Sequence, residues 1–344
     1  MTDMKKRFLK LTVFAAILLT LFACGRGGPG SSSTGRWNLT DLPLPSGYVL
    51  DPMQIPDYDP AEGTVRLYAF TVRNDGGSIL FENRRFTLSF GGDVFEATEI
   101  PLPPTERITL ALFSEEADTF LSVDSDPKAR RYVLHKRFAA AGTLQSVSLT
   151  DFYPDGEKPE PDTMTADPEG VLYIGIGKAL LLFDADLNYL KTMAFPGEDF
   201  SYSSLGRSAD GRILLSHTWS LTSENGKSLS EVDKNADQVA YGSQFNSMGA
   251  IPAFPAVSEE TGSFYAWSKE GLWRMTPGAA DQYRAEQLAD FAAENLRFLT
   301  GVRKSGYIRI ALPIRDDFFL CTKCKLREGI AAADLCVLRF GEKP

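Results

Sequence analysis

The sequence predicts an all-β protein, and three observations carry that prediction. First, the stretch from Thr165 to Phe195 reads as one small antiparallel sheet, with apolar strands at 171–176, 179–183 and 189–195. Strand-forming runs bounded by Gly, Pro, Asp and Asn are typical of a β-meander. Second, a polar turn that usually ends in Gly recurs before apolar strands. Third, only residues 279–298, rich in Ala, Glu and Gln, resemble a helix. We favour an outer strand followed by an inner one there over a short inserted helix.

The recurring turn sets the size of a repeating unit. Its copies end at Gly63, Asp118 (a degenerate copy), Gly170, Gly211, Gly262 and Gly306. The spacings of 55, 52, 41, 51 and 44 residues average about 49, so six units match the roughly 295 residues from Ser46 to Phe340. Repeats of this length, made of short strands, are typical of the blades of a β-propeller, including WD40-like ones. Immunoglobulin-like sandwiches would need units of about 100 residues.

The sequence therefore predicts a β-propeller over residues 46–344, with six blades favoured. Seven blades of about 42 residues each stay open, although only six turns are found. A four-stranded sheet cannot bury both faces alone, and a ring of sheets lets neighbours cover them. Within a unit, we expect the Gly turn to join the innermost strand to the second strand. One blade would then run through strands at 203–208, 213–218, 229–233 and 238–245.

The N-terminal residues have the order of a secretory signal. Lys5, Lys6 and Arg7 precede a largely apolar run from Phe8 to Ala23, which is short for a membrane span. The following Leu21-Phe22-Ala23-Cys24-Gly25 resembles the lipobox of bacterial lipoproteins. The resemblance implies that residues 1–23 are removed and that Cys24 carries lipid such as palmitate, which anchors an extracytoplasmic protein to the cell membrane. An ordinary cleaved signal with an incidental Cys is the alternative.

Residues 24–45 are predicted to be the lipidated Cys and a flexible tether, because 26–35 is rich in Gly and Ser. The whole chain has a formal net charge of −9, and removal of residues 1–23 would bring it to about −12. An acidic protein of this kind lacks the basic surface that nucleic acid requires. The sequence thus predicts contact with the membrane through the lipid and no nucleic-acid partner.

Residues suited to catalysis are sparse. The chain has two histidines, His135 and His217, and we interpret both as hydrogen-bonded strand residues rather than general bases. No zinc-protease, nucleophile-elbow, phosphate-loop or dinucleotide motif is found. The stretch Asp184-Ala-Asp-Leu-Asn188 begins like a calcium loop but lacks the Gly and Glu that such a loop needs further on. We expect a polar hairpin turn there, and no metal, cofactor or catalytic residue.

Three cysteines lie near the C-terminus. Cys321 and Cys336 are candidates for a cross-strand disulfide, because 318–321 and 335–340 look like neighbouring strands. Free buried thiols are the alternative. The Cys321-x-x-Cys324 spacing also occurs in redox and metal sites, but no βαβ pattern surrounds it and no His lies nearby.

The leading functional hypothesis is a non-catalytic module that binds a small solute, a glycan or a protein. Candidate residues for a ligand face are Trp219, Trp267, Arg207 and Arg303, although packing between blades is the favoured interpretation of the tryptophans. The alternatives are a cell-surface hydrolase or lyase, for which Asp210 and His217 would join the two arginines, and a structural envelope scaffold.

The signal, the tether and the loose repeat are together similar to the propeller portion of Firmicutes-type lipoproteins. That resemblance implies a link to solute capture for transport. In those proteins the propeller region precedes a solute-binding domain, whereas this sequence stops at Pro344, where that domain would begin.

Overall fold

The computed structural model describes the chain from Arg36 to Gly341 with internal gaps. The described residues are 36–125, 131–152, 160–195, 201–207, 210–221, 224–239, 243–244, 256–257, 264–267, 271–277, 283–291, 293 and 308–341. They belong to one compact unit, residues 36–344.

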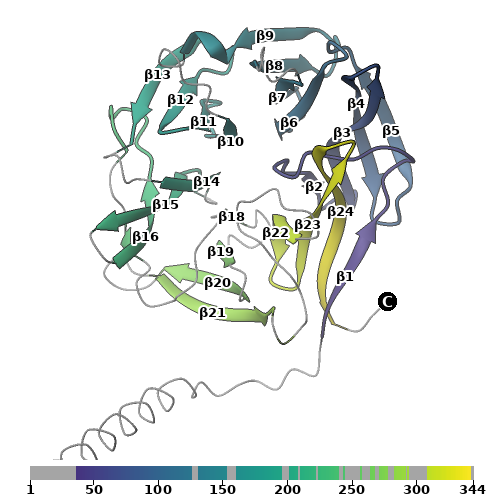
Figure 1. The fold of residues 1–344 in the computed structure, drawn as a ribbon. Coiled ribbons are helices and arrows are strands. Elements are labelled where there is room, and N and C mark those ends of the chain that lie inside the picture. The colour runs from purple at the N-terminus through teal and green to yellow at the C-terminus, as the bar shows by residue number, and fades with distance from the viewer. Residues whose placement is uncertain are drawn as a thin grey trace, which may run out of the picture. The chain divides into compact units, whose positions relative to one another are not determined.

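The described strands form six four-stranded sheets whose strands all pair antiparallel (Figure 1). The first sheet in chain order is β2(Asp57–Asp59), β3(Thr64–Asp75), β4(Ser78–Ser89) and β5(Val94–Ile100), and the second is β6(Glu106–Leu112), β7(Ala117–Asp124), β8(Tyr132–Phe138) and β9(Leu144–Ser148). The third sheet is β10(Pro161–Ala166), β11(Leu172–Ile176), β12(Ala179–Phe183) and β13(Tyr189–Ala194). The fourth sheet is β14(Ser201–Arg207), β15(Ile213–Leu221), β16(Glu224–Glu231) and β17(Ser243–Gln244). A short 3-10 helix, Leu149–Phe152, follows β9.

The fifth sheet is β18(Ala256–Val257), β19(Phe264–Trp267), β20(Gly271–Pro277) and β21(Tyr283–Asp290). The sixth, which we name the closing sheet, takes β22(Ile308–Arg315), β23(Phe318–Arg327) and β24(Ile330–Gly341) from the C-terminal end and β1(Arg36–Leu42) from the N-terminal end.

The sheets are set around a common centre (Figure 1). The first strand of each sheet contacts the first strand of the next from β6 through β10, β14 and β18 to β22. These first strands are therefore innermost. The predicted all-β propeller is confirmed. The preference for six blades over seven stays a prediction, with which the six described sheets agree.

Strand alternation explains how one sheet joins its two neighbours. In the β10–β13 sheet, Ile174 and Phe183 pack in a core shared with the β6–β9 sheet. Tyr173 and Leu182 point to the opposite face and pack in a core shared with the β14–β17 sheet. Side chains alternate between the two faces of a strand, so a strand buried on both sides is apolar at every position, as β12 is. The meander expected at 171–195 is confirmed.

Three of the predicted Gly turns lie where the repeat places them, and Gly262 and Gly306 themselves lie outside the described residues. Gly63, Gly170 and Gly211 have φ of +63°, +85° and +85°, each just before the second strand of its sheet. Gly211 also packs against the preceding sheet, because a Cβ there would lie 2.5 Å from Pro168 Cγ. Only glycine combines that conformation with that close approach. Gly306 breaks the pattern, because the strand after it is β22, the innermost strand of the closing sheet.

The prediction of an outer strand followed by an inner strand at residues 279–298 is correct for the outer strand. β21, Tyr283–Asp290, is the outermost strand of its sheet, as predicted. The next described strand is β22, which begins at Ile308 and supplies the inner strand of the following sheet. The expected inner strand at 291–298 falls largely outside the described residues.

The flexible tether predicted for residues 24–45 includes a segment that belongs to the fold. Arg36–Leu42, within the predicted range 24–45, forms β1 and pairs along its whole length with β24, from Arg36 opposite Gly341 to Leu42 opposite Leu335. Trp37 is 5% exposed and packs in the core between the closing sheet and the β18–β21 sheet. Burial of this Trp and pairing with β24 make the segment part of the fold, so the folded unit begins at Arg36 instead of Ser46.

Among the described residues, no helix is long and apolar enough to cross a membrane.

Candidate functional site

The structure describes only part of the predicted ligand face. Arg207 is exposed at the end of β14. Asp210 is also exposed and accepts a hydrogen bond from Arg212 Nε at 2.8 Å. Arg303 lies outside the described residues. Trp219 and His217 lie in β15, but their side chains are also outside the described part.

For Trp267 the favoured interpretation, packing between blades, is confirmed, and the alternative of a ligand face does not hold. Its side chain is 0% exposed, and it packs in the core between the closing sheet and the β18–β21 sheet. Tyr265, two residues earlier on the same face of β19, is buried in the same core. Alternation along the strand directs both aromatic rings into the seam between two sheets, so Trp267 stabilises the ring rather than contacting a ligand.

The cysteines are free thiols in this structure, not the expected disulfide. Cys321 and Cys336 are opposite each other in the pairing of β23 with β24, as the predicted strands require. Both are fully buried, and Cys336 Sγ donates to the carbonyl oxygen of Cys321 at 3.5 Å. Burial raises the pKa of the Cys336 thiol to about 12, which disfavours the thiolate that would begin disulfide exchange. Cys324 is three residues from Cys321, so it faces the other side of the sheet.

His135 is the hydrogen-bonded strand histidine that the sequence predicts. Its Nε2 lies 2.9 Å from Ser122 Oγ and its Nδ1 lies 2.7 Å from Ser146 Oγ. Ser122 in turn donates to Glu106 Oε2 at 2.7 Å. These four side chains come from β6, β7, β8 and β9 and cross the whole sheet. The serine stands between the acid and the imidazole, which is not the order of a catalytic triad.

Burial, with a smaller contribution from the charge of Arg131, lowers the pKa of His135 to about 4. Its ring is stacked on Phe120 at 5.0 Å between centroids. A neutral imidazole held by two serines is a structural group at neutral pH.

The first polar region that the sequence did not predict is the chain between β1 and β2. Residues 43–56, which we name the connecting segment, run from the outer strand of one sheet to the inner strand of the next. Val49 bridges to Phe70 in β3, and Leu50 bridges to Ala333 in β24. The segment thereby holds two neighbouring sheets together at the point where the ring closes.

Two buried arginines on inner strands, Arg107 and Arg309, find partners in the connecting segment. Asp51, 0% exposed, forms an ion pair with Arg107 of β6. Arg309 of β22 donates to the carbonyl oxygen of Pro52 at 2.7 Å. Nearby, Gln54 Oε1 accepts from the Tyr68 backbone N–H at 2.7 Å. These contacts reach three sheets, and buried charges need such partners. The arrangement can hold the ring together.

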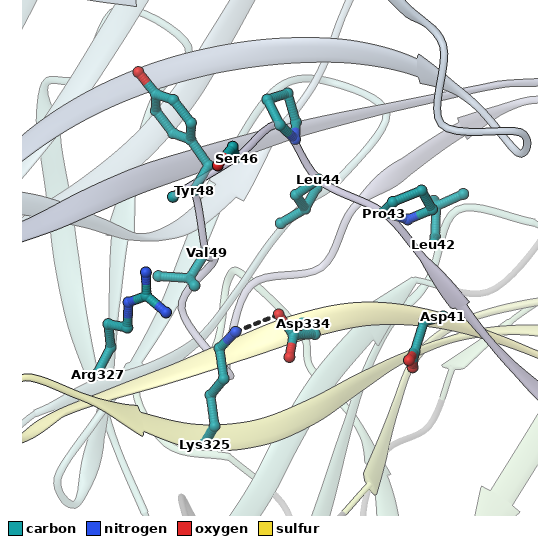
Figure 2. A pocket seen from close by; sticks show the side chains of 12 residues that line it. Asp41, Leu42, Pro43, Leu44, Ser46, Tyr48, Val49, Lys325, Arg327 and Asp334 are labelled. Carbon is teal, nitrogen blue, oxygen red and sulfur yellow. Dashed lines mark hydrogen bonds and ion pairs between the residues drawn. The ribbon is translucent and has the colours of Figure 1, made fainter.

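The second polar region is a surface pocket of about 350 Å³ that lies between the start of the connecting segment and the closing sheet (Figure 2). We name it the rim pocket. Its lining residues are Asp41–Val49, Lys325, Arg327 and Asp334. Its volume is within the range of small-ligand sites.

Strand register puts the charged residues of the rim pocket on one face of the closing sheet. Asp41 is opposite Cys336, and Asp334 is two residues from Cys336. Lys325 is opposite Ala332, and Arg327 is two residues further along β23. Opposite residues and residues two apart share a face. The face that is buried at Cys321 and Cys336 therefore reaches solvent at these charged positions.

The charges of the rim pocket are only partly matched. Lys325 forms an ion pair with Asp334, and the two side chains are 30% and 44% exposed. Arg327 and Asp41 are both exposed. Neither makes an ion pair or hydrogen bond with another residue in the described part of the chain. Figure 2 shows Arg327 at one end of the pocket, Asp41 at the other, and the ion pair between them.

Tyr48 lines the rim pocket, and its side chain is held in place by contacts with β4. Its hydroxyl donates to Glu82 Oε1 at 2.7 Å, and its ring meets Phe86 edge-on at 5.0 Å. Arg84 lies over the same ring at 5.8 Å. Burial, together with the hydrogen bond to Glu82, raises the pKa of Tyr48 to about 12. The connecting segment is thus fixed to β4 beside the pocket.

Within the described ranges, no group of three or more His, Cys, Asp or Glu side chains is placed to hold a metal ion. The calcium-like stretch forms the expected hairpin turn. Asp184 Oδ1 accepts from the backbone N–H groups of Asp186 and Asn188 at 2.9 and 2.8 Å, and Oδ2 accepts from the Asn188 side chain. The carboxylate that would bind calcium therefore caps its own turn.

Comparisons with known proteins support the fold alone. No family model matches the chain, and no curated protein matches its sequence. Among solved structures, the chain is similar to the endosialidase of phage phi92, with 10% identity, a TM-score of 0.54, and coverage of 90% of this chain and 69% of that one.

Two further similarities are weaker. A candidate 6-phosphogluconolactonase from Bacteroides uniformis has 12% identity, a TM-score of 0.46 and coverage of 84% and 88%. A protein from Lactobacillus plantarum has 13% identity, a TM-score of 0.46 and coverage of 86% and 89%.

Proposed function

We propose that this chain is a lipid-anchored, extracytoplasmic lipoprotein whose six-bladed propeller binds a small solute, glycan or protein without catalysis. The lipobox-like order at 21–25 supports the anchor. Lipid on Cys24 would attach the protein to the membrane, because each buried methylene adds about 0.8 kcal/mol. A link to solute capture for transport is part of the same proposal.

One observation favours binding over catalysis. Two arginines on inner strands, Arg107 and Arg309, already contact the connecting segment, whereas the rim pocket presents charged side chains to solvent. General acid–base catalysis needs a titrating group within reach of a substrate. His135 is buried among its partners, and burial holds its pKa at about 4. The described residues thus supply a binding surface more readily than a reaction centre.

The anchor is tested by metabolic labelling with a clickable palmitate analogue in a bacterium that processes lipoproteins. We expect the wild type to incorporate the label and to sediment with membranes. Cys24→Ala should lose both properties, whereas Cys324→Ala, which removes a buried thiol elsewhere, should keep the label. Equal labelling of wild type and Cys24→Ala, or no labelling of either, would overturn the anchor.

Binding is tested by a thermal-shift screen of the mature chain against sugars, peptides, amino acids and phosphorylated metabolites. A ligand that binds only the folded state stabilises it by about 2.7 kcal/mol at a hundredfold excess over Kd. A shift with one chemical class supports capture. A shift accompanied by conversion of the compound, followed by mass spectrometry, would instead favour the hydrolase or lyase alternative. No shift with any class would contradict small-solute binding.

A further inference from the structure

The rim pocket carries an inference that rests on the proposed binding function and narrows its ligand. We propose that the rim pocket binds a short peptide with free termini, with the peptide carboxylate at Arg327 and the peptide ammonium at Asp41. The proposal depends on the charge pattern of the pocket, on its position in the fold and on the chemistry of its walls.

The charge pattern fits a zwitterion. Two cations, Lys325 and Arg327, and two anions line the pocket, so their formal charges cancel. Because Lys325 and Asp334 neutralise each other, a cation and an anion are left at opposite ends (Figure 2). An anion alone would leave Asp41 unmatched, and a cation alone would leave Arg327 unmatched. A ligand with one charge of each sign, separated along its length, matches both.

The ion pair in the middle favours a peptide over a single amino acid. In an amino acid the ammonium and carboxylate share one carbon, whereas here the Lys325–Asp334 pair lies between the two ends (Figure 2). A peptide separates its terminal charges by its backbone, whose N–H and C=O groups can hydrogen-bond to the ion pair as it passes. Each extended residue adds about 3.3 Å.

The remaining walls suit a peptide. Pro43, Leu44 and Pro45 supply apolar surface from the connecting segment. Tyr48 is fixed by its hydrogen bond to Glu82, so that wall is preorganised and little side-chain entropy is lost when a ligand binds. Arginine is well matched to a carboxylate, because its planar guanidinium can donate two parallel hydrogen bonds.

Binding in the rim pocket would also reinforce ring closure. The pocket is formed by the connecting segment on one side and the β23–β24 pair on the other. A bound peptide would bridge these two parts of the chain. We therefore expect ligand to raise the midpoint of thermal unfolding in proportion to its saturation.

The test uses calorimetric titration of the mature protein with trialanine, N-acetyl-trialanine and trialanine amide. The acetyl group removes the peptide ammonium and the amide removes the peptide carboxylate. Each blocked peptide should bind about tenfold more weakly than trialanine, because it loses one charge-assisted contact at a solvent-exposed site. Arg327→Gln should abolish the preference for a free carboxylate and keep the preference for a free ammonium. Asp41→Asn should do the reverse. This exchange of preferences reports recognition and not folding.

Arg73→Gln is the matched control, because Arg73 is 73% exposed, lies on β3 and is not part of the pocket. It should leave both preferences unchanged. The inference is overturned when trialanine fails to bind a protein whose circular dichroism and unfolding midpoint are normal. It is also overturned when both variants retain the wild-type preferences. Binding of another ligand class in the thermal-shift screen would then leave the proposed binding function standing while the peptide inference falls.

Discussion

The connecting segment and the rim pocket place similar charges in opposite surroundings. In the first, Asp51 is 0% exposed and is paired with Arg107. In the second, Asp41 is exposed and has no such partner among the residues that the structure describes. Buried charge requires a partner inside the protein, whereas exposed charge is solvated by water. The difference separates charges that hold the ring together from charges that remain available to a ligand.

The largest expected effect is at the buried ion pair. Asp51→Ala leaves the Arg107 guanidinium buried without its carboxylate and also removes the acceptor of the Met53 backbone N–H at 2.9 Å. Breaking one partner of a buried pair costs about 3–5 kcal/mol. Urea unfolding should show this loss in the free energy of unfolding.

Asp41→Ala provides the matched control at the rim, where we expect a change within about 0.5 kcal/mol. Similar losses for the two aspartates would show that the comparison between buried and exposed charge does not hold for this protein.

A smaller effect is expected when pH changes the charge of a buried group. The pKa of His135 is about 4 in the folded state, against 6.5 for an ordinary histidine. Between these values the unfolded chain binds a proton that the folded chain does not, so stability falls as pH decreases. The contribution reaches about 3 kcal/mol once pH is below both values.

The measurement is the free energy of unfolding at pH 7, 6, 5 and 4 for the wild type and His135→Gln. The wild type should lose more stability than the variant across this window, because the variant has no imidazole to titrate. Parallel pH profiles for the two proteins would refute the role of His135, whatever the carboxylates contribute.

The smallest effect is expected at the exposed ion pair of the rim pocket. Lys325 and Asp334 are 30% and 44% exposed, and pairs of this kind contribute about 0–1 kcal/mol. Asp334→Asn should therefore reduce stability only slightly, and the difference should shrink further in 0.5 M salt, where exposed charges are screened. A loss as large as that of Asp51→Ala would place this pair among the groups that hold the ring together.

Local patterns predicted much of the sheet structure. The apolar run at 171–183 and its Gly turn predicted β11 and β12, because period-2 alternation and turn residues are encoded in neighbouring positions. The prediction from local patterns was wrong at residues 36–42, which were included in the flexible tether because a Gly/Ser-rich stretch precedes them. Trp37 and Leu39 alternate there between Gly35 and Pro43, and this alternation was the available signal for a strand.

The candidate sites were harder to predict, because their residues meet only through the fold. Asp51 and Arg107 are 56 positions apart, and no local pattern pairs them. Trp267 fits both packing between blades, which is favoured, and a ligand face, because large aromatic residues suit both and the strand pattern does not say which neighbour covers a face. For the rim pocket, the sequence contained one weak indication of where charged side chains gather. Charged residues at 323, 325 and 327 follow buried Cys321 at alternate positions, which marks where one face of β23 leaves the core.

The pairing of β1 with β24 also affects how the chain reaches its folded state. The partners Arg36 and Gly341 stand at opposite ends of the described chain, so β1 stays unpaired during synthesis until β24 has been made. Until the two strands pair, the β22–β24 part of the closing sheet keeps an open edge along β24, which is a surface on which chains aggregate. Contacts between residues so distant in sequence also slow folding. Closure of the ring is therefore the event that ends the chain's exposure to aggregation during folding.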